Sequence, residues 1–176
     1  KKLSFVPKIY LNKKYNKASQ ITIGIGGSGT DKKWEIKNYI KLLNLILVKN
    51  SIENIVIAGG KNELKDAKKI VFSFMNNKNI KIFNLCKKTI DGSIPFLAKS
   101  KLYVGNDTGF MHLSGLLNII SIGIFGASPP DYSSYNKNII PITPPKKRRV
   151  GYGDQMMSNI TPEIVYRNIK KVSHIK

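Results

Sequence analysis

The sequence predicts an α/β fold: a doubly wound parallel sheet of about six strands with helices on both faces. Two observations indicate this fold. Short apolar runs alternate with longer amphipathic segments along the chain, which is the order of a βαβ protein. Most short runs are apolar along their whole length, as strands buried on both faces of a parallel sheet are. The 176 residues suffice for one domain with a full hydrophobic core.

Six short runs are the expected strands. The first, QITIGIGG, begins at Gln20, and the second, IENIVIAGG, ends at the glycine pair Gly59-Gly60. The later runs are shorter, but each lies between two segments of different periodicity. The expected strands are residues 20–27, 52–60, 80–85, 101–105, 119–126 and 138–143.

Five segments between and after these runs are the expected helices. Residues 32–49 place Trp34, Tyr39 and several leucines at helical spacing. The last helix has Thr161 as its expected N-cap and Pro162 at its first position. The expected helices are residues 32–49, 61–76, about 93–99, 109–117 and 161–172.

The first 20 residues differ from the rest of the chain. Residues 1–20 are polar and basic with little periodicity, so we expect a linker or an edge segment there, and the domain proper over residues 21–176. The single cysteine, Cys86, excludes an internal disulfide framework and a Cys-rich metal site. No apolar run approaches the roughly 20 residues that a membrane span needs.

The chain is strongly basic. Lys and Arg number 30 against 10 Asp and Glu, a formal net charge of +20. This charge favours anionic partners such as nucleic acid, an anionic membrane, or phosphorylated and acidic glycans. An AT-rich genome also produces sequences crowded with Lys, Asn and Ile. The charge alone therefore does not select a partner.

Ligands of a doubly wound sheet bind beyond the carboxyl ends of its strands. The first such end is GIGGSGTDKKW, residues 24–34, which contains the pattern G-x-G-x-x-G. A dinucleotide site also needs an acid at the end of the second strand, but that strand ends Ala58-Gly59-Gly60. The glycines therefore fit better as positions where backbone N–H groups approach an anion.

Polar residues of the same stretch support an anion site. Ser28 can donate a hydrogen bond to a phosphate oxygen. Lys32 and Lys33 are expected at the start of the helix over residues 32–49, where a cation is unfavourable unless an anion binds there. The alternative is two solvated lysines. Glu63, after the second strand, is either a favourable first-turn acid or a hydrogen-bond acceptor for ribose hydroxyls.

The stretch GNDTGFMHLSG, residues 105–115, ends the fourth expected strand. Asp107 or Thr108 could cap the helix that follows, but this explains only one of them. His112 lies about one helical turn further on, so its side chain should lie over the same turn. The N–H groups of Thr108 and Gly109 would point out of the helix N-terminus toward an anion. We therefore expect Asp107 and His112 to contact a ligand.

These segments together resemble a known family. GNDTGFMHLSGLLNIISIGIFGAS, residues 105–128, looks like the signature of the heptosyltransferases of glycosyltransferase family 9, which build the inner core of lipopolysaccharide. SGTDKKW (28–34) is similar to their phosphate loop, and VIAGGKNE (56–63) to their second strand and acid. MMSNITPEIVYRNI (156–169) resembles their closing helix, and the likeness covers about residues 20–170.

The resemblance implies a fold and a donor. The fold would be GT-B, in which two Rossmann-like domains face each other across a cleft. This chain would be the C-terminal, nucleotide-sugar-binding domain, and the N-terminal acceptor domain would be absent from it. The donor would be a nucleotide-diphosphate sugar such as ADP-heptose. Its base and sugar stay open at this point.

The resemblance also implies a role for each site residue. Ser28 and Lys32 would hold the diphosphate, together with the amides of Thr108 and Gly109. Glu63 would hold the ribose, and Lys88 with its two following residues would lie near the base. Asp107 and His112 would lie at the phosphate and sugar end of the donor.

The implied reaction is an inverting transfer that needs no metal and no cofactor. The general base, an Asp, would belong to the N-terminal domain. No catalytic residue is therefore expected in this chain, which should not catalyse transfer alone. The acceptor would be an acidic, lipid-linked glycan. The implied location is cytoplasmic, with peripheral binding to the inner membrane as an added expectation.

Two other classes of function stay open. PPKKRRV, residues 144–150, resembles a basic nuclear-import or nucleic-acid patch, but the chain has no recognisable nucleic-acid-binding module. Nucleic acid is therefore the less favoured partner. The same run would also suit an anionic lipid or an acidic acceptor, or be a solvated loop. The third class is a binding module that keeps the fold and has lost transfer activity.

Overall fold

The computed structural model describes residues 8–12, 14–48, 51–145 and 149–172. Its six strands form one sheet, every neighbouring pair is parallel, and the order is β3-β2-β1-β4-β5-β6. This confirms the expected α/β fold with a doubly wound parallel sheet. The strands are β1 (Gln20–Gly24), β2 (Asn54–Ala58), β3 (Lys81–Asn84), β4 (Leu102–Asn106), β5 (Ile120–Ile124) and β6 (Ile139–Ile142).

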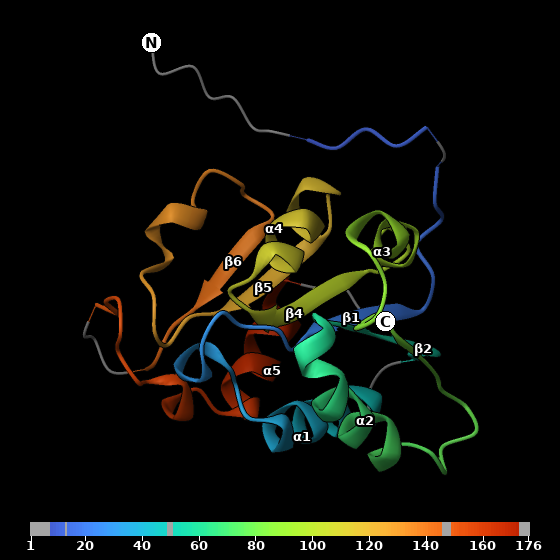
Figure 1. Ribbon diagram of the computed structural model, residues 1–176, viewed down its shortest axis with the longest axis horizontal. Coiled ribbons are helices and arrows are strands. Elements are labelled where there is room, and N and C mark those ends of the chain that lie inside the picture. Colours follow the sequence, from blue (N-terminus) through green and yellow to red (C-terminus); the bar gives the residue numbers. More distant parts are fainter. Residues whose placement is uncertain (1–7, 13, 49–50, 146–148, 173–176) are drawn as a thin grey trace.

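Helices cover both faces of the sheet. Figure 1 shows α1, α2 and α5 on one face and α3 and α4 on the other. Right-handed crossovers between parallel strands produce this arrangement. The helices are α1 (Ile36–Leu47), α2 (Leu64–Ser73), α3 (Ile90–Leu97), α4 (Gly109–Leu116) and α5 (Pro162–Val172).

The two central strands, β1 and β4, meet where the strand order reverses. Their register pairs Gly24 with Gly105. A Cβ on Gly105 would lie only 2.4–2.7 Å from backbone atoms of Gly24, and one on Gly24 would overlap the Tyr103 ring. Both glycines are therefore needed for the close approach of these strands. The reversal leaves a crevice at their carboxyl ends, where ligands of such sheets bind.

The hydrophobic core has two parts. The larger part includes buried residues of β1, β2, α1 and α5, with Trp34 and Tyr39 in edge contact at 4.9 Å between ring centroids. The smaller part lies around α4 and contains Tyr103, Met111 and Phe125. Burying each large apolar side chain stabilises the fold by about 1.5–3 kcal/mol. The two parts of the core thus hold β1 and α4, which border the crevice, in place.

The helix expected over residues 32–49 begins later than predicted. Residues Thr30–Lys32 form a short 3-10 turn, and α1 starts only at Ile36. The backbone N–H of Trp34 donates to Asn106 Oδ1 at 3.0 Å, and its indole N–H donates to the carbonyl of Ile160 at 2.7 Å. These two long-range hydrogen bonds tie Trp34 to β4 and to the segment before α5, so the helix starts after it.

Two other helix starts depend on threonines. The helix expected at about residues 93–99 begins earlier, at Ile90, because Thr89 Oγ1 accepts a hydrogen bond from the N–H of Gly92. The closing helix begins at Pro162 as predicted, and Thr161 Oγ1 accepts from the N–H of Ile164. The first signal was missed, and the second was read correctly.

The segment before β1 lies against the domain. The N–H of Ile9 donates to the carbonyl of Leu116, and that of Ala18 to the carbonyl of Lys99. Residues 1–7 lie outside the described part, so a linker over residues 1–20 stays a prediction. Among the helices of the described residues, none combines the length and apolar character needed to cross a membrane.

Candidate functional site

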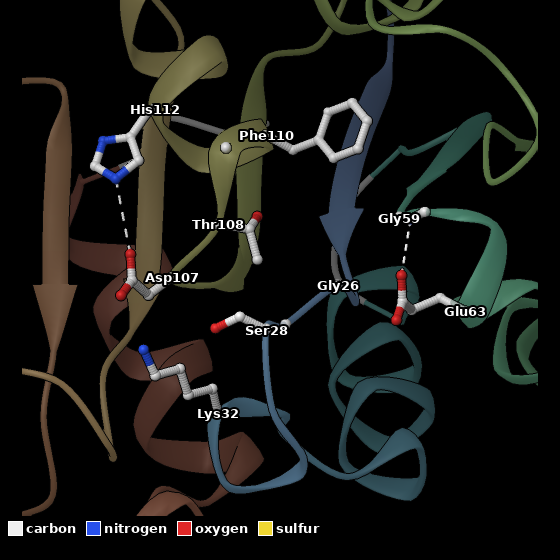
Figure 2. A pocket seen from close by; sticks show the side chains of 12 residues that line it. Gly26, Ser28, Lys32, Gly59, Glu63, Asp107, Thr108, Phe110 and His112 are labelled. Carbon is white, nitrogen blue, oxygen red and sulfur yellow. Dashed lines mark hydrogen bonds and ion pairs between the residues drawn. The ribbon is translucent and has the colours of Figure 1, made fainter. Parts of the chain in front are cut away.

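A cavity of about 450 Å³ lies beyond the carboxyl ends of β1, β2 and β4 (Figure 2). It occupies the crevice at the reversal of strand order. Seven of the eight predicted site residues line it; Lys88 does not. The lining residues are Gly26, Gly27, Ser28, Lys32, Gly59, Gly60, Glu63, Asp107, Thr108, Gly109, Phe110 and His112.

The N-terminus of α4 opens into this cavity. Thr108 is the N-cap, with φ −150° and ψ 168°, but its side chain accepts no hydrogen bond from the helix. Its hydroxyl lies 3.4 Å from that of Tyr103 instead. Within the described residues, nothing accepts a hydrogen bond from the N–H groups of Thr108, Gly109 and Phe110. A helix start with free N–H groups and the positive end of its dipole suits an anion.

Thr108 therefore occupies the N-cap position, as suggested, but neither its side chain nor that of Asp107 accepts a hydrogen bond from the helix amides. Ser128 Oγ donates to Asp107 Oδ2 at 2.8 Å, so the carboxylate turns away from the helix amides. Asp107 Oδ1 lies 3.7 Å from His112 Nε2, the contact drawn as a dashed line in Figure 2. The side chains of Asp107 and His112 are only 11% and 26% exposed. The predicted proximity of this pair is confirmed.

The loop between β1 and α1 borders the opposite side of the cavity. Asn106, the last residue of β4, is fully buried and holds this loop. Its Oδ1 accepts from the N–H of Trp34 and from the Tyr39 hydroxyl, and its Nδ2 donates to the carbonyl of Gly26 at 2.7 Å. The single hydroxyl proton of Tyr39 is shared between Asn106 Oδ1, at 2.9 Å, and the carbonyl of Gly24, at 2.7 Å. One amide side chain thus fixes the phosphate-loop-like segment to the β4–α4 turn.

Lys32 and Ser28 project from this loop into the cavity. Figure 2 shows the Lys32 side chain directed toward the β4–α4 turn. In the described part of the chain no acidic side chain pairs with Lys32. The expectation that it starts a helix is wrong, so the helix dipole provides no support for an anion near it. The support comes from an unpaired cation beside free helix amides.

Lys33 and Glu63 form a pair that joins two loops. Lys33 Nζ lies 2.7 Å from Glu63 Oε1, and the N–H of Gly60 donates to Glu63 Oε2 at 2.8 Å. Lys33 is therefore not a solvated lysine. Glu63 is buried, with 6% of its surface exposed, and its two bonds fix its carboxylate at the cavity wall. The first-turn role is confirmed, and the geometry leaves the carboxylate beside the cavity.

Cys86 lies close behind the same wall. A Cβ on Gly59 would be 3.3 Å from its sulfur. Burial, and then the nearby Glu63 carboxylate, raise the pKa of the Cys86 thiol to about 11. The thiol is therefore neutral at physiological pH, which fits a packing role.

Two predicted features lie away from the cavity. Lys88 precedes α3, and its Nζ lies 5.2 Å from the centroid of the Phe96 ring. Most of the basic run at residues 146–149 lies outside the described residues. Its last member, Arg149, pairs with Asp131 at 2.5 Å, and this bond raises the pKa of the guanidinium further. The described residues contain no group of three or more His, Cys, Asp or Glu placed to hold a metal.

Sequence reasoning missed three residues that support the site: Asn106, Ser128 and Tyr135. Tyr135 lies beyond β5, and its hydroxyl is 2.8 Å from His112 Nδ1. Ser128 and Tyr135 are distant from Asp107 and His112 in sequence, so no local spacing indicated them. Asn106 had a signal, because a polar amide at the last position of a buried strand requires partners.

Comparison with known proteins gives a consistent result. The profile of glycosyltransferase family 9 (heptosyltransferase) matches residues 8–155. Lipooligosaccharide heptosyltransferase 2 of Campylobacter jejuni serotype O:6 is 28% identical over 161 residues, which are 82% of this chain and 48% of that protein. The chain spans about half the length of the curated relatives it matches.

Two solved structures share the fold. E. coli ADP-heptose lipopolysaccharide heptosyltransferase II has a TM-score of 0.73 at 23% identity, covering 86% of this chain and 45% of that one. E. coli heptosyltransferase WaaC with ADP also has a TM-score of 0.73, at 21% identity, covering 92% and 47%. The match to the family profile extends over most of the chain, including the β1–α1 loop and the β4–α4 turn. The chain therefore belongs to glycosyltransferase family 9, the heptosyltransferase family.

Proposed function

We propose that this chain is the donor-binding part of an inverting, metal-independent heptosyltransferase of lipopolysaccharide core assembly. Its cavity would bind a nucleotide-diphosphate sugar of the ADP-heptose type. The observation that carries the proposal is the uncapped N-terminus of α4, which faces Lys32 and Ser28 across the cavity. The family and the similarity to a heptosyltransferase with ADP support the choice of ligand.

The diphosphate fits the positive features of the cavity. The amides of Thr108, Gly109 and Phe110 can each donate to a phosphate oxygen, and Ser28 can donate from the opposite loop. Lys32 adds a full charge that no carboxylate of the described residues neutralises. A hydrogen bond to a charged group contributes about 1.5–3 kcal/mol. Several such bonds suffice for selective binding of a diphosphate.

Glu63 fits the ribose. Each carboxylate oxygen can accept two hydrogen bonds, and each is used once, by Lys33 or by the Gly60 amide. The remaining lone pairs can accept from the ribose hydroxyls of a nucleotide in the cavity. Lys88 does not line the cavity, so its proposed place near the base rests on the family resemblance alone.

The proposed reaction follows from these contacts. An acceptor hydroxyl attacks the anomeric carbon while the bond from that carbon to the diphosphate oxygen breaks, and the bonding electrons leave with the diphosphate. Lys32 and the α4 amides stabilise the negative charge that develops there, a task that other enzymes give to a metal. The general base would be supplied by an N-terminal acceptor domain, which takes the proton from the acceptor.

The remaining partners are part of the same proposal. The acceptor would be an acidic, lipid-linked glycan held mainly by the N-terminal domain. The net charge of +20 would favour such an acceptor and an anionic membrane surface. Nucleic acid is the competing anion, and the experiment below includes it for that reason.

Calorimetric titration of the chain tests the proposal. The ligands are ADP, GDP, UDP, NAD and a short DNA duplex, at physiological and at high salt. We expect ADP to bind selectively and Lys32→Ala to weaken it at least about tenfold, since 1.4 kcal/mol corresponds to that factor. Lys78→Ala, an exposed lysine before β3 at the opposite edge of the sheet, is the matched control and should bind normally.

Three results would contradict the proposal. Tight DNA binding that is lost at high salt, without nucleotide binding, would mean that the chain functions by binding nucleic acid through its positive charge. Equal loss of ADP affinity in Lys32→Ala and Lys78→Ala would mean that ADP binds through overall charge and not in the cavity. If ADP binds but the full-length protein transfers no sugar, the chain is a binding module of the same fold.

A further inference from the structure

The segment after β5 contacts both Asp107 and His112. Ser128 Oγ donates to Asp107 Oδ2 at 2.8 Å. The Tyr135 hydroxyl lies 2.8 Å from His112 Nδ1, and the two rings are nearly parallel, at 19°. Neither Ser128 nor Tyr135 lines the cavity. Both act on it through the side chains of another turn.

This segment is itself held in place. Ser128 is 2% exposed, and Ser133 Oγ donates to the carbonyl of Pro130. The Tyr132 ring packs against Phe125, with centroids 6.1 Å apart, and Arg149 pairs with Asp131. The short turn between Ser128 and Tyr135 is thus tied to β5 and to the chain after β6. These contacts favour one placement of the two side chains that touch Asp107 and His112.

Two contacts of the His112 ring favour one position for its proton. Nε2 faces a carboxylate oxygen of Asp107 at 3.7 Å, which favours a proton on Nε2. Nδ1 is then an acceptor and needs a donor. The Tyr135 hydroxyl keeps its proton at neutral pH, because the pKa of a tyrosine is ordinarily about 10 and partial burial raises it, so the hydroxyl can donate to Nδ1. Both contacts therefore favour the same neutral tautomer.

We propose that Tyr135 and Ser128 are positioning residues that hold His112 as its Nε2–H tautomer, aimed with Asp107 at the donor's diphosphate. Figure 2 shows the His112–Asp107 pair at the cavity wall, with Nε2 directed at the carboxylate. At 3.7 Å from the carboxylate, the Nε2–H group makes no hydrogen bond to Asp107 and remains a donor for a phosphate or sugar oxygen, and Asp107 is an acceptor for a sugar hydroxyl. This role rests on the proposed function, because it assumes a nucleotide sugar in the cavity.

Four groups other than the ligand face the imidazole or the same space. They are Asp107, Tyr132 and Tyr135 at the ring, and Lys32 across the cavity. Tyr132 provides a matched control. Its ring lies 5.9 Å from that of His112, centroid to centroid, and its hydroxyl has no hydrogen-bond partner in the described part of the chain. Tyr132→Phe removes the same atom from the same turn without touching Nδ1.

Nitrogen-15 NMR of the side-chain imidazoles reads the tautomer directly. The chain has two histidines, His112 and His174, so a His174→Gln variant assigns the His112 signals. In the ligand-free wild-type chain we expect a protonated Nε2 and an unprotonated Nδ1. In Tyr135→Phe we expect a mixture of tautomers, and in Tyr132→Phe the wild-type pattern. Ser128→Ala should also move the signals, because Asp107 is free to rotate.

Titration with ADP then links the tautomer to binding. Tyr135→Phe should weaken ADP binding roughly two- to tenfold, the range of one neutral hydrogen bond, and Tyr132→Phe should not. A protonated Nδ1 in the wild type, or identical tautomers and affinities in Tyr135→Phe and Tyr132→Phe, would overturn the inference. Because the tautomer is read without ligand, failure of ADP to bind would refute the proposed function separately.

Discussion

Two loops border the cavity from opposite sides, and they are fixed in different ways. The β4–α4 turn is short, and α4 begins at Gly109, where the local sequence predicts it. The β1–α1 loop is long, and hydrogen bonds from Asn106 and Tyr39 hold it from outside. The backbone of the first loop is set by residues near in sequence, although Ser128 and Tyr135 orient its side chains, whereas the backbone of the second is held by residues far from it. Four substitutions test this difference.

Asn106→Ala should have the largest effect. It removes three hydrogen bonds and leaves the N–H of Trp34 and the carbonyl of Gly26 without a partner. We expect the free energy of unfolding to fall by about 3 kcal/mol, as buried polar groups lose their partners. Urea denaturation measures this. Asn76→Ala, at an exposed position after α2, is the control and should stay within about 0.5 kcal/mol. Equal stabilities would refute the role of Asn106.

The two buried tyrosines compare the loops directly. Tyr39 donates to the carbonyl of Gly24 and contacts Asn106, whereas the Tyr103 hydroxyl has one contact at 3.4 Å, with Thr108. Tyr39→Phe should lower the free energy of unfolding by about 2 kcal/mol, and Tyr103→Phe by less than about 0.5 kcal/mol. Thermal denaturation of the two variants in parallel decides this. A larger loss in Tyr103→Phe would reverse the comparison.

The same tyrosines predict a loss of stability in alkali. Burial raises the pKa of both hydroxyls above the usual 10.0. Above about pH 10 the unfolded chain releases these protons and the folded chain keeps them. The contribution of the two tyrosines to the free energy of unfolding is therefore fully present below about pH 10 and decreases above it. Each tyrosine adds up to about 1.4 kcal/mol per pH unit to the slope.

Urea denaturation between about pH 8 and about pH 11 measures this slope. Each Tyr→Phe variant should reduce this slope by up to the contribution of one proton, about 1.4 kcal/mol per pH unit. The wild type should therefore have the steepest slope of the three chains. Other groups that titrate in this range are present in all three chains, so their contribution cancels. A wild-type slope no steeper than that of either variant would show that the hydroxyls titrate normally in the folded chain.

Thr108→Asp should have the smallest effect on stability and an opposite effect on binding. An Asp at the N-cap can accept from the free α4 amides and interacts favourably with the helix dipole, a gain of about 0.5–1 kcal/mol. It also places a negative charge where the diphosphate would bind, so ADP affinity should fall. Thr108→Asn caps without the charge and separates the two causes. Unchanged ADP affinity in Thr108→Asp would place the nucleotide elsewhere.

Most of the fold could be predicted from the sequence, because its causes are local. The six strands are apolar runs, and Thr161 and Pro162 mark the start of α5. The start of α1 could not be predicted, because Trp34 is held by Asn106 and Ile160, 72 and 126 residues away. Trp34 does stand at helical spacing from the apolar residues of α1, but it lies before the first residue of that helix.

The sequence predicted most of the residues at the site but few of the contacts that hold them. Asp107, Thr108, Gly109 and His112 lie together because one turn brings them together. Lys32 lines the cavity, but it lies in a 3-10 turn and not at the expected start of a helix. Tyr135 and Ser128 could not be found, since their only relation to the site is a contact across the chain. Long-range hydrogen bonds leave no spacing that a single sequence reveals.

The central claim is that the free amides at the start of α4 bind a nucleotide diphosphate. Backbone ¹⁵N–¹H NMR of the chain during titration with ADP tests it most directly. The account predicts that the largest shifts occur at Thr108, Gly109, Phe110 and Ser28, and that inorganic phosphate moves part of the same set. Shifts concentrated instead at a second groove, which is lined by Lys8, Lys14 and Lys17 and by residues 116–118, would contradict it.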